Sequence, residues 1–154
     1  MGATSRAARS SGGMLTRSDV LLVVHLDWST SGREVVFDAE DDAWICDFLT
    51  RAAADLGCKA LAVGNAGEHV HMLVSLAPVL ALGELVRKLK GGSAHAWNVR
   101  APERRLRWQS GYWARSVRPD DLDELRAYVL EQRRRHERTA HLHTSSEEPA
   151  LGRA

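Results

Sequence analysis

Residues 68–76 read Glu68-His69-Val70-His71-Met72-Leu73-Val74-Ser75-Leu76. The alternation at its start and the apolar run that follows predict a strand from His69 to Leu76. Side chains two apart on a strand share a face at about 6 to 7 Å, so both imidazoles can reach one divalent metal ion while Val70 packs on the other face. A catalytic metal site needs at least a third protein ligand. Alone, the motif also fits two polar residues on an exposed strand face.

The segments around this strand alternate between extended and helical patterns. A strand is expected at Cys58–Val63, joined to the first by the turn formers Gly64-Asn65-Ala66-Gly67. The other expected elements are strands at Asp19–Trp28 and Tyr112–Val117, an extended piece at Glu34–Phe37, and helices at Asp41–Leu56, Leu80–Asn98 and Asp120–His136. This β-α-β-β-α-β order predicts an α+β fold, a ferredoxin-like or RRM-like sandwich with helices on one face of an antiparallel sheet and an extra C-terminal helix.

The length of 154 residues and the 44% hydrophobic share indicate one domain with enough material for a core. We expect this domain to cover residues 18–136, between flexible tails at 1–17 and 137–154 that lack hydrophobic periodicity. The apolar run at 20–24 is too short for a membrane span or an export signal, so a cytoplasmic protein without membrane contact is expected. Cys46 and Cys58 lack metal-type spacing and are expected to be buried thiols.

Basic residues concentrate in the second half of the chain. The span from Arg87 to Arg118 contains nine basic residues and the single acid Glu103. Only three of the 21 basic residues in the chain are lysines. Because the guanidinium group suits bidentate phosphate contacts and base stacking, this bias favours a nucleic-acid partner, although a GC-rich genome would also produce it. The residues expected to bind nucleic acid are Arg87, Lys88, Lys90, Arg105, Arg107, Arg115 and Arg118.

The last expected helix contains a second candidate constellation. Tyr128 and Gln132 are four residues apart and therefore share a helix face. A tyrosine nucleophile near a metal ligand fits phosphodiester chemistry, because the phosphotyrosine would keep the energy of the broken bond and no nucleotide cofactor would be needed. By themselves, the two residues also fit an amphipathic helix with ordinary surface side chains.

Four segments in this order together resemble one family. They are His69-Val70-His71, the helix Glu84–Gly91, the segment Trp108–Trp113 and Tyr128–Gln132. They look like the HUH-type tyrosine transposases, the small single-strand transposases of simple insertion sequences and their relatives associated with repeated extragenic palindromes. The resemblance spans about residues 19–136.

The resemblance implies a role for each matching residue. His69 and His71 match the two metal-binding histidines, Tyr128 matches the nucleophile, and Gln132 matches the third metal ligand. Family members are dimers in which the tyrosine helix can complete the partner's site. They cleave single-stranded DNA beside a hairpin and keep the 5′ end as a phosphotyrosine, with Mg²⁺ or Mn²⁺ as cofactor. By analogy the arginine-rich span would hold the hairpin, with Trp97, Trp108 or Trp113 available to stack on bases.

The chain departs from the family pattern before its paired histidines. Gly67-Glu68 stands where the family often has Pro-Asp, which changes the expected turn but not the ligands. His25 fits a functional residue, but the favoured interpretation is a hydrogen-bonded histidine at a strand end, and we expect His136 to be a surface residue. Neutral imidazole ligands, with an ordinary pKa near 6.5, predict that activity falls below about pH 6.

Two other functions remain open from the sequence. One is a catalytically silent protein that binds hairpin DNA or RNA on the same fold, although the intact set of Tyr128, His69, His71 and Gln132 argues against it. The other is an RRM-like RNA-binding module, which would use aromatic side chains on its central strands where this chain has imidazoles. The sequence does not decide whether Tyr128 acts in its own subunit or in its partner's.

Overall fold

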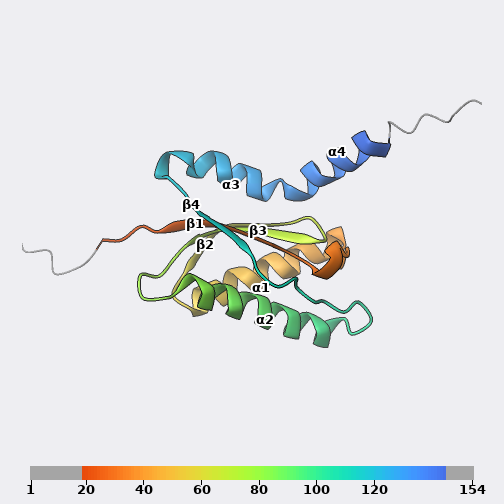
Figure 1. Ribbon diagram of the computed structural model, residues 1–154, viewed down its shortest axis with the longest axis horizontal. Coiled ribbons are helices and arrows are strands. Elements are labelled where there is room, and N and C mark those ends of the chain that lie inside the picture. Colours follow the sequence, from red (N-terminus) through yellow and green to blue (C-terminus); the bar gives the residue numbers. More distant parts are fainter. Residues whose placement is uncertain (1–18, 145–154) are drawn as a thin grey trace, which may run out of the picture.

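The computed structural model describes residues 19–144, so the tail expected at 1–17 and residues 145–154 lie outside the described part. The elements run β1 (Val23–Ser29), α1 (Asp42–Asp55), β2 (Lys59–Asn65), β3 (His69–Ser75), α2 (Leu82–Arg100), β4 (Trp113–Ser116), α3 (Leu122–Leu130) and α4 (Gln132–Thr144), with three short 3-10 turns between them. The four strands form one antiparallel sheet in the order β2-β3-β1-β4 (Figure 1). The α+β sandwich expected from the sequence is confirmed.

The main core lies between the sheet and helices α1 and α2, which cover one face (Figure 1). Alternation along the two central strands sends Leu26, Val70 and Met72 into this core, where each is fully buried. Helix α1 contributes Ile45, Leu49 and Ala53 from one face at helical spacing. Gly91 and Gly92 do not interrupt α2, which runs continuously to Arg100.

Helices α3 and α4 lie over the opposite face of the sheet (Figure 1). The apolar contact there is small, because it centres on Ala62, Leu73 and Val129. An ion pair adds to it: Arg133 Nε and Nη2 donate to the Asp42 carboxylate at 2.5 and 2.6 Å. Helix α4 is therefore fastened to the start of α1, whereas the rest of this layer rests on few buried side chains.

Two local expectations differ from the structure, and the extended piece expected at 34–37 stays outside the four-stranded sheet. The N–H groups of Val36 and Phe37 both donate to the carbonyl of Gly67. The single helix expected at 120–136 is two helices that meet at Glu131, whose backbone leaves helical geometry. Helix α4 also continues to Thr144, past the point where the sequence placed the start of a tail.

Cys58 is buried, Cys46 is half-buried, and both thiols are free, as expected. Within residues 19–144, no helix combines the length and the apolar character that crossing a membrane requires.

Candidate functional site

The sheet face beneath α3 carries the paired histidines. Because Val70 and Met72 point into the main core, His69 and His71 point to the α3 side. The two imidazoles share one face, as the spacing predicts, and their ring centroids are 5.1 Å apart. His25 on β1 reaches the same face, where its ring centroid is 5.3 Å from that of His71.

His25 fixes the orientation of His71. His25 Nε2 and His71 Nδ1 are 3.0 Å apart, and both residues are buried. When His71 Nδ1 carries the proton, it donates a hydrogen bond to His25 Nε2. The other ring nitrogen of His71, Nε2, is then the one that can bind a metal. His25 is hydrogen-bonded, as expected, and the structure adds that its partner is one of the paired histidines.

Burial determines the protonation of this pair. Burial, together with the charges that His69 and His25 carry when protonated, lowers the pKa of His71 to about 3. Burial also lowers the pKa of His25. The negative charge of Asp27 raises this pKa in part, and the positive charge of Arg115 lowers it further. His71 therefore stays neutral well below pH 6, so its titration does not produce the fall in activity that an ordinary histidine pKa predicts.

The lowered pKa predicts an acid-sensitive fold. The unfolded chain binds a proton at His71 near pH 6.5, and the folded chain binds it only near pH 3. The free energy of unfolding therefore has its full value above about pH 6.5 and decreases as the pH falls from 6.5 to 3. We expect the metal-free protein to lose on the order of 1 kcal/mol per pH unit through this residue. Urea unfolding at pH 7 and pH 5 measures the loss, and His71→Gln should reduce it. Equal losses in both proteins would contradict the pKa.

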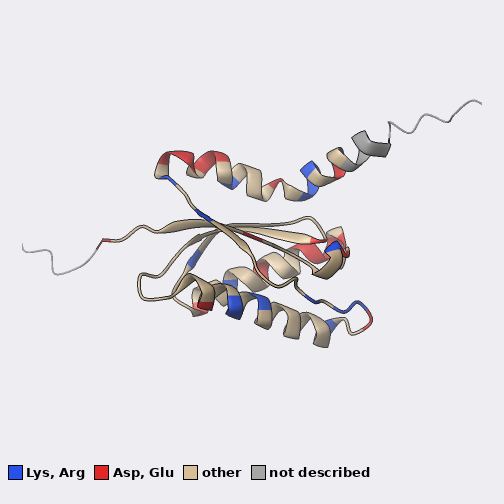
Figure 2. Cartoon of the chain, in the orientation of Figure 1, with Lys and Arg blue, Asp and Glu red and all other residues tan. Residues whose placement is uncertain are grey.

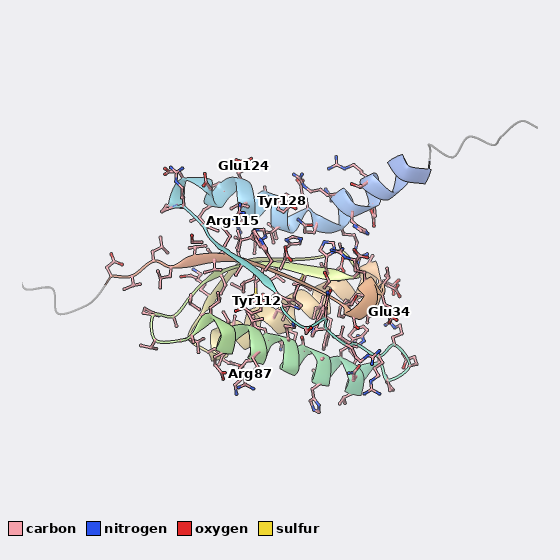
Figure 3. The ribbon with its side chains drawn as sticks, viewed as in Figure 1. Glu34, Arg87, Tyr112, Arg115, Glu124 and Tyr128 are labelled. Atoms are coloured by element: carbon pink, nitrogen blue, oxygen red, sulfur yellow. The ribbon has the colours of Figure 1, made fainter. Side chains whose placement is uncertain are left out.

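Tyr128 lies above the histidine pair. Its ring centroid is 5.8 Å from that of His71 and 6.3 Å from that of His25, with the rings nearly perpendicular in both contacts. The residue remains 36% exposed and lines an open cavity, so it is accessible from solvent. The guanidinium carbon of Arg135 lies 5.0 Å from the centre of the ring. Figure 3 shows Tyr128 between α3 and the sheet, on the same side as Arg115.

Gln132 is buried where α4 begins, over Gly64 of β2. Its Nε2 donates to the carbonyl of Tyr128 at 3.1 Å, which leaves the amide oxygen as the atom for a metal. Gly64 on β2 pairs directly with His71, and a Cβ built on Gly64 would lie 3.2 Å from Gln132 Cγ. The break at Glu131 puts Tyr128 and Gln132 on different helices, yet this hydrogen bond keeps them together.

Gly64 allows α3 to sit directly on the sheet. A Cβ at this position would lie 1.8 Å from the carbonyl oxygen of Val129, so any larger residue must push the helix away. We expect Gly64→Ala to accelerate amide exchange in residues 122–139 while β1, β3 and α2 remain protected. Gly91→Ala is the matched control, because nothing lies within 4 Å of its added methyl group. Unchanged exchange in α3 of the Gly64 variant would contradict this close contact.

His69 has a neighbourhood that sequence reasoning missed. Its ring centroid is 5.6 Å from that of His136 on α4, and its Nδ1 is 3.4 Å from the carboxylate of Glu68. This Nδ1 is buried and makes no hydrogen bond. The repeat Tyr128, Gln132, His136 at intervals of four could have indicated His136, which the sequence analysis assigned to the surface.

The donor set fits a divalent metal. His69 has a buried nitrogen without a hydrogen-bond partner, His71 has Nε2 available, and Gln132 has its amide oxygen directed away from the hydrogen bond to Tyr128. Imidazole nitrogens and an amide oxygen are suitable ligands for Mn²⁺, and the oxygen also suits Mg²⁺.

A cavity of about 520 Å³ opens beside Tyr128. Two of the predicted DNA-binding residues, Arg115 and Arg118, line it together with Trp113 and Glu124. Trp113 is 40% exposed, and the guanidinium of Arg115 lies 5.0 Å from its ring centre. Of the three tryptophans considered for base stacking, Trp97 is fully buried and Trp108 is half-buried, so Trp113 is the one open to a base.

The other predicted DNA-binding residues lie away from Tyr128. Arg87 and Lys88 are on α2, across the sheet from the tyrosine (Figure 3), and Arg87 pairs with Glu84 at 2.7 Å. Arg105 and Arg107 are exposed in the loop before β4. Lys90 donates to the carbonyl oxygens of Gln109 and Gly111, so it secures that loop. Figure 2 shows Lys and Arg positions, in blue, along α2 and the loop before β4, and further ones on α4.

The part of the chain that carries the paired histidines and Tyr128 matches a family of known proteins. The family model described as "Transposase IS200 like" matches residues 19–132. The chain belongs to the IS200-like transposase family. It is accordingly a DNA transposase, an enzyme that cleaves and rejoins DNA.

Individual relatives agree with this assignment. The transposase is 27% identical over 117 residues to the ISDra2 transposase TnpA of Deinococcus radiodurans. The matched region covers 72% of this chain and 84% of the relative. A crystal structure described as that of a transposase from Deinococcus radiodurans R1 matches with a TM-score of 0.61 and 22% identity, over 82% of this chain and 98% of the other. A REP-associated tyrosine transposase bound to a REP hairpin matches with a TM-score of 0.58 and 15% identity, over 80% of this chain and 74% of the other. These two structural matches show that the fold is shared.

Proposed function

We propose that this transposase cleaves and rejoins single-stranded DNA beside a hairpin through a 5′-phosphotyrosine at Tyr128. The observation that carries the proposal is the position of Tyr128, whose ring centroid lies 5.8 Å from that of His71. A nucleophile and two candidate metal ligands thus meet on one face of the sheet, beside an open cavity. The proposed cofactor is Mg²⁺ or Mn²⁺, held by His69, His71 and Gln132.

The chemistry follows from the positions of these side chains. Tyr128 Oη attacks the scissile phosphorus and gives up its proton as the new P–O bond forms. The bond from phosphorus to the 3′ oxygen breaks, and that oxygen leaves as a 3′ hydroxyl. When bound, the metal would polarise a non-bridging oxygen of the phosphate. Attack of a 3′ hydroxyl on the phosphotyrosine reverses these steps and rejoins the DNA.

The surface beside Tyr128 is suited to holding the strand that is cut. The guanidinium groups of Arg115 and Arg118 can contact phosphates, and the exposed ring of Trp113 can stack on an unpaired base. The hairpin would contact the remaining basic residues, Arg87, Lys88, Lys90, Arg105 and Arg107. As the family resemblance implies, the proposed active form is a homodimer.

Trapping of a covalent adduct tests this function. Single strands from the DNA flanking the gene, labelled at either the 5′ or the 3′ end, are incubated with the protein and Mn²⁺ and separated on a denaturing gel. A protein-linked band that carries the 3′-labelled fragment would support the proposed chemistry and its polarity. If strands that bind give no adduct, the reaction is rejected in favour of a silent hairpin-binding protein.

A further inference from the structure

Three side chains on α3 and α4 lie along the strand that carries the paired histidines. Tyr128, Gln132 and His136 follow one another at intervals of four residues. Tyr128 lies next to His71, with ring centroids 5.8 Å apart, and His136 lies next to His69, with ring centroids 5.6 Å apart. The helices therefore cross the histidine pair in the opposite direction to β3, and His136 is at the His69 end.

The atoms at the His69 end are close enough to share an ion. Glu68, His69 and His136 each offer one ligand atom, and these atoms all lie within 4.8 Å of one another. Two ligands of one ion, each about 2.1 Å from it, are about 3.0 to 4.2 Å apart. Movements of less than about 1 Å, within the rotamer freedom of the exposed His136, would bring the atoms to this range.

His69 also indicates that a ligand belongs at this place. A buried ring nitrogen without a hydrogen-bond partner is uncommon in proteins, and His69 Nδ1 is such an atom. The Glu68 carboxylate, fixed by Arg33 at 2.9 Å, lies 3.4 Å from this nitrogen. Its negative charge reduces the cost of bringing a cation between the two imidazoles.

We propose that His136 is a further ligand of the metal centre. The proposal rests on the proposed function, because it extends the set formed by His69, His71 and Gln132. A centre with three imidazoles favours transition-metal ions, whereas Mg²⁺ prefers oxygen ligands. His136 thereby makes the transposase selective for Mn²⁺ or Co²⁺ over Mg²⁺.

Direct metal binding tests this role without measuring activity. Co²⁺ is titrated into the metal-free, full-length protein, its visible absorption reports the ligands, and Mn²⁺ and Mg²⁺ are measured by competition. We expect His136→Ala and His136→Gln to raise the Kd for Co²⁺ and Mn²⁺ roughly tenfold or more, since even outer partners of a metal site change affinity by about 10 to 100 times. The Kd for Mg²⁺ should change less than about threefold. His95→Ala, an exposed histidine on α2, is the matched control and should bind like the wild type.

Two results would overturn the proposal, and they differ in what else they reject. If His71→Ala weakens Co²⁺ binding and both His136 variants bind with the wild-type Kd and spectrum, His136 is not a ligand but the proposed metal centre stands. If neither the His71 nor the His136 substitutions change Co²⁺ binding, the metal centre of the proposed function fails as well. Thermal unfolding of each variant verifies that it is folded.

Discussion

Tyr128→Phe is expected to bind hairpin-containing single strands as the wild type does and to form no covalent adduct. The substitution keeps the ring that contacts His71, His25 and Arg135 and removes only the hydroxyl. The fold and the DNA surface should therefore be unchanged. Because the hydroxyl is the proposed nucleophile, we expect cleavage to fall at least about 10³-fold, the scale at which loss of a nucleophile acts.

Tyr112→Phe is the matched control, because the chain has only these two tyrosines. Tyr112 is 43% exposed, as accessible as Tyr128, and lies just before β4. Adduct yield on a denaturing gel and binding by mobility shift are measured for both variants. An adduct that persists in Tyr128→Phe and disappears in Tyr112→Phe would assign the nucleophile to the other tyrosine.

The alternation and spacing of apolar residues predicted most of the fold. The strands at β2 and β3 and the helix α1 match the expected segments within two residues, because local patterning determines which side of each element is buried. The antiparallel pairing of β2 and β3 followed from the turn formers between them. Tyr128 and the histidine pair could also be recognised, because i, i+2 on a strand and i, i+4 on a helix are local relations.

The contacts that sequence reasoning did not predict join distant segments of the chain. His25 contacts His71 only because β1 pairs with β3, and His136 reaches His69 only because α4 crosses that strand. The helix breaks at Glu131, although neither Glu131 nor its neighbours Leu130 and Gln132 is a helix-breaking Gly or Pro. The break occurs where the end of α3 lies directly on Gly64 and the following residue, Gln132, is buried against the same glycine. Local propensity carries no information on such tertiary contacts.

The layer that carries the tyrosine is attached differently from the rest of the fold. The main core buries large side chains from both helices and the sheet, whereas α3 rests on the small cluster around Val129. The Arg133–Asp42 ion pair, with Asn65 donating to the same carboxylate at 2.7 Å, anchors α4. Segments with few buried apolar contacts open at low free-energy cost. Among the described elements, we therefore expect α3 to open at lower free-energy cost than the helices of the main core, α1 and α2.

His71→Ala is expected to abolish metal-dependent cleavage and to leave hairpin binding largely intact. The side chain is 9% exposed beneath α3, so it contributes little surface to a DNA partner. Its Nε2 is the nitrogen oriented for a metal by the hydrogen bond to His25. Loss of a ligand should reduce cleavage at least about 100-fold, since substitutions outside the ligand shell already reach that size.

Cleavage over a range of Mn²⁺ concentrations, together with mobility shifts on the same labelled hairpin strand, separates the two functions of the protein. The guanidinium groups of Arg115 and Arg118, which we propose hold the DNA, are on and after β4 and do not depend on the His71 imidazole. A ligand role therefore predicts weak cleavage with normal binding, and high Mn²⁺ should restore part of the rate because the remaining ligands still bind the metal. If His71→Ala instead loses hairpin binding but cleaves the strands that do bind at the wild-type rate, His71 belongs to the DNA interface.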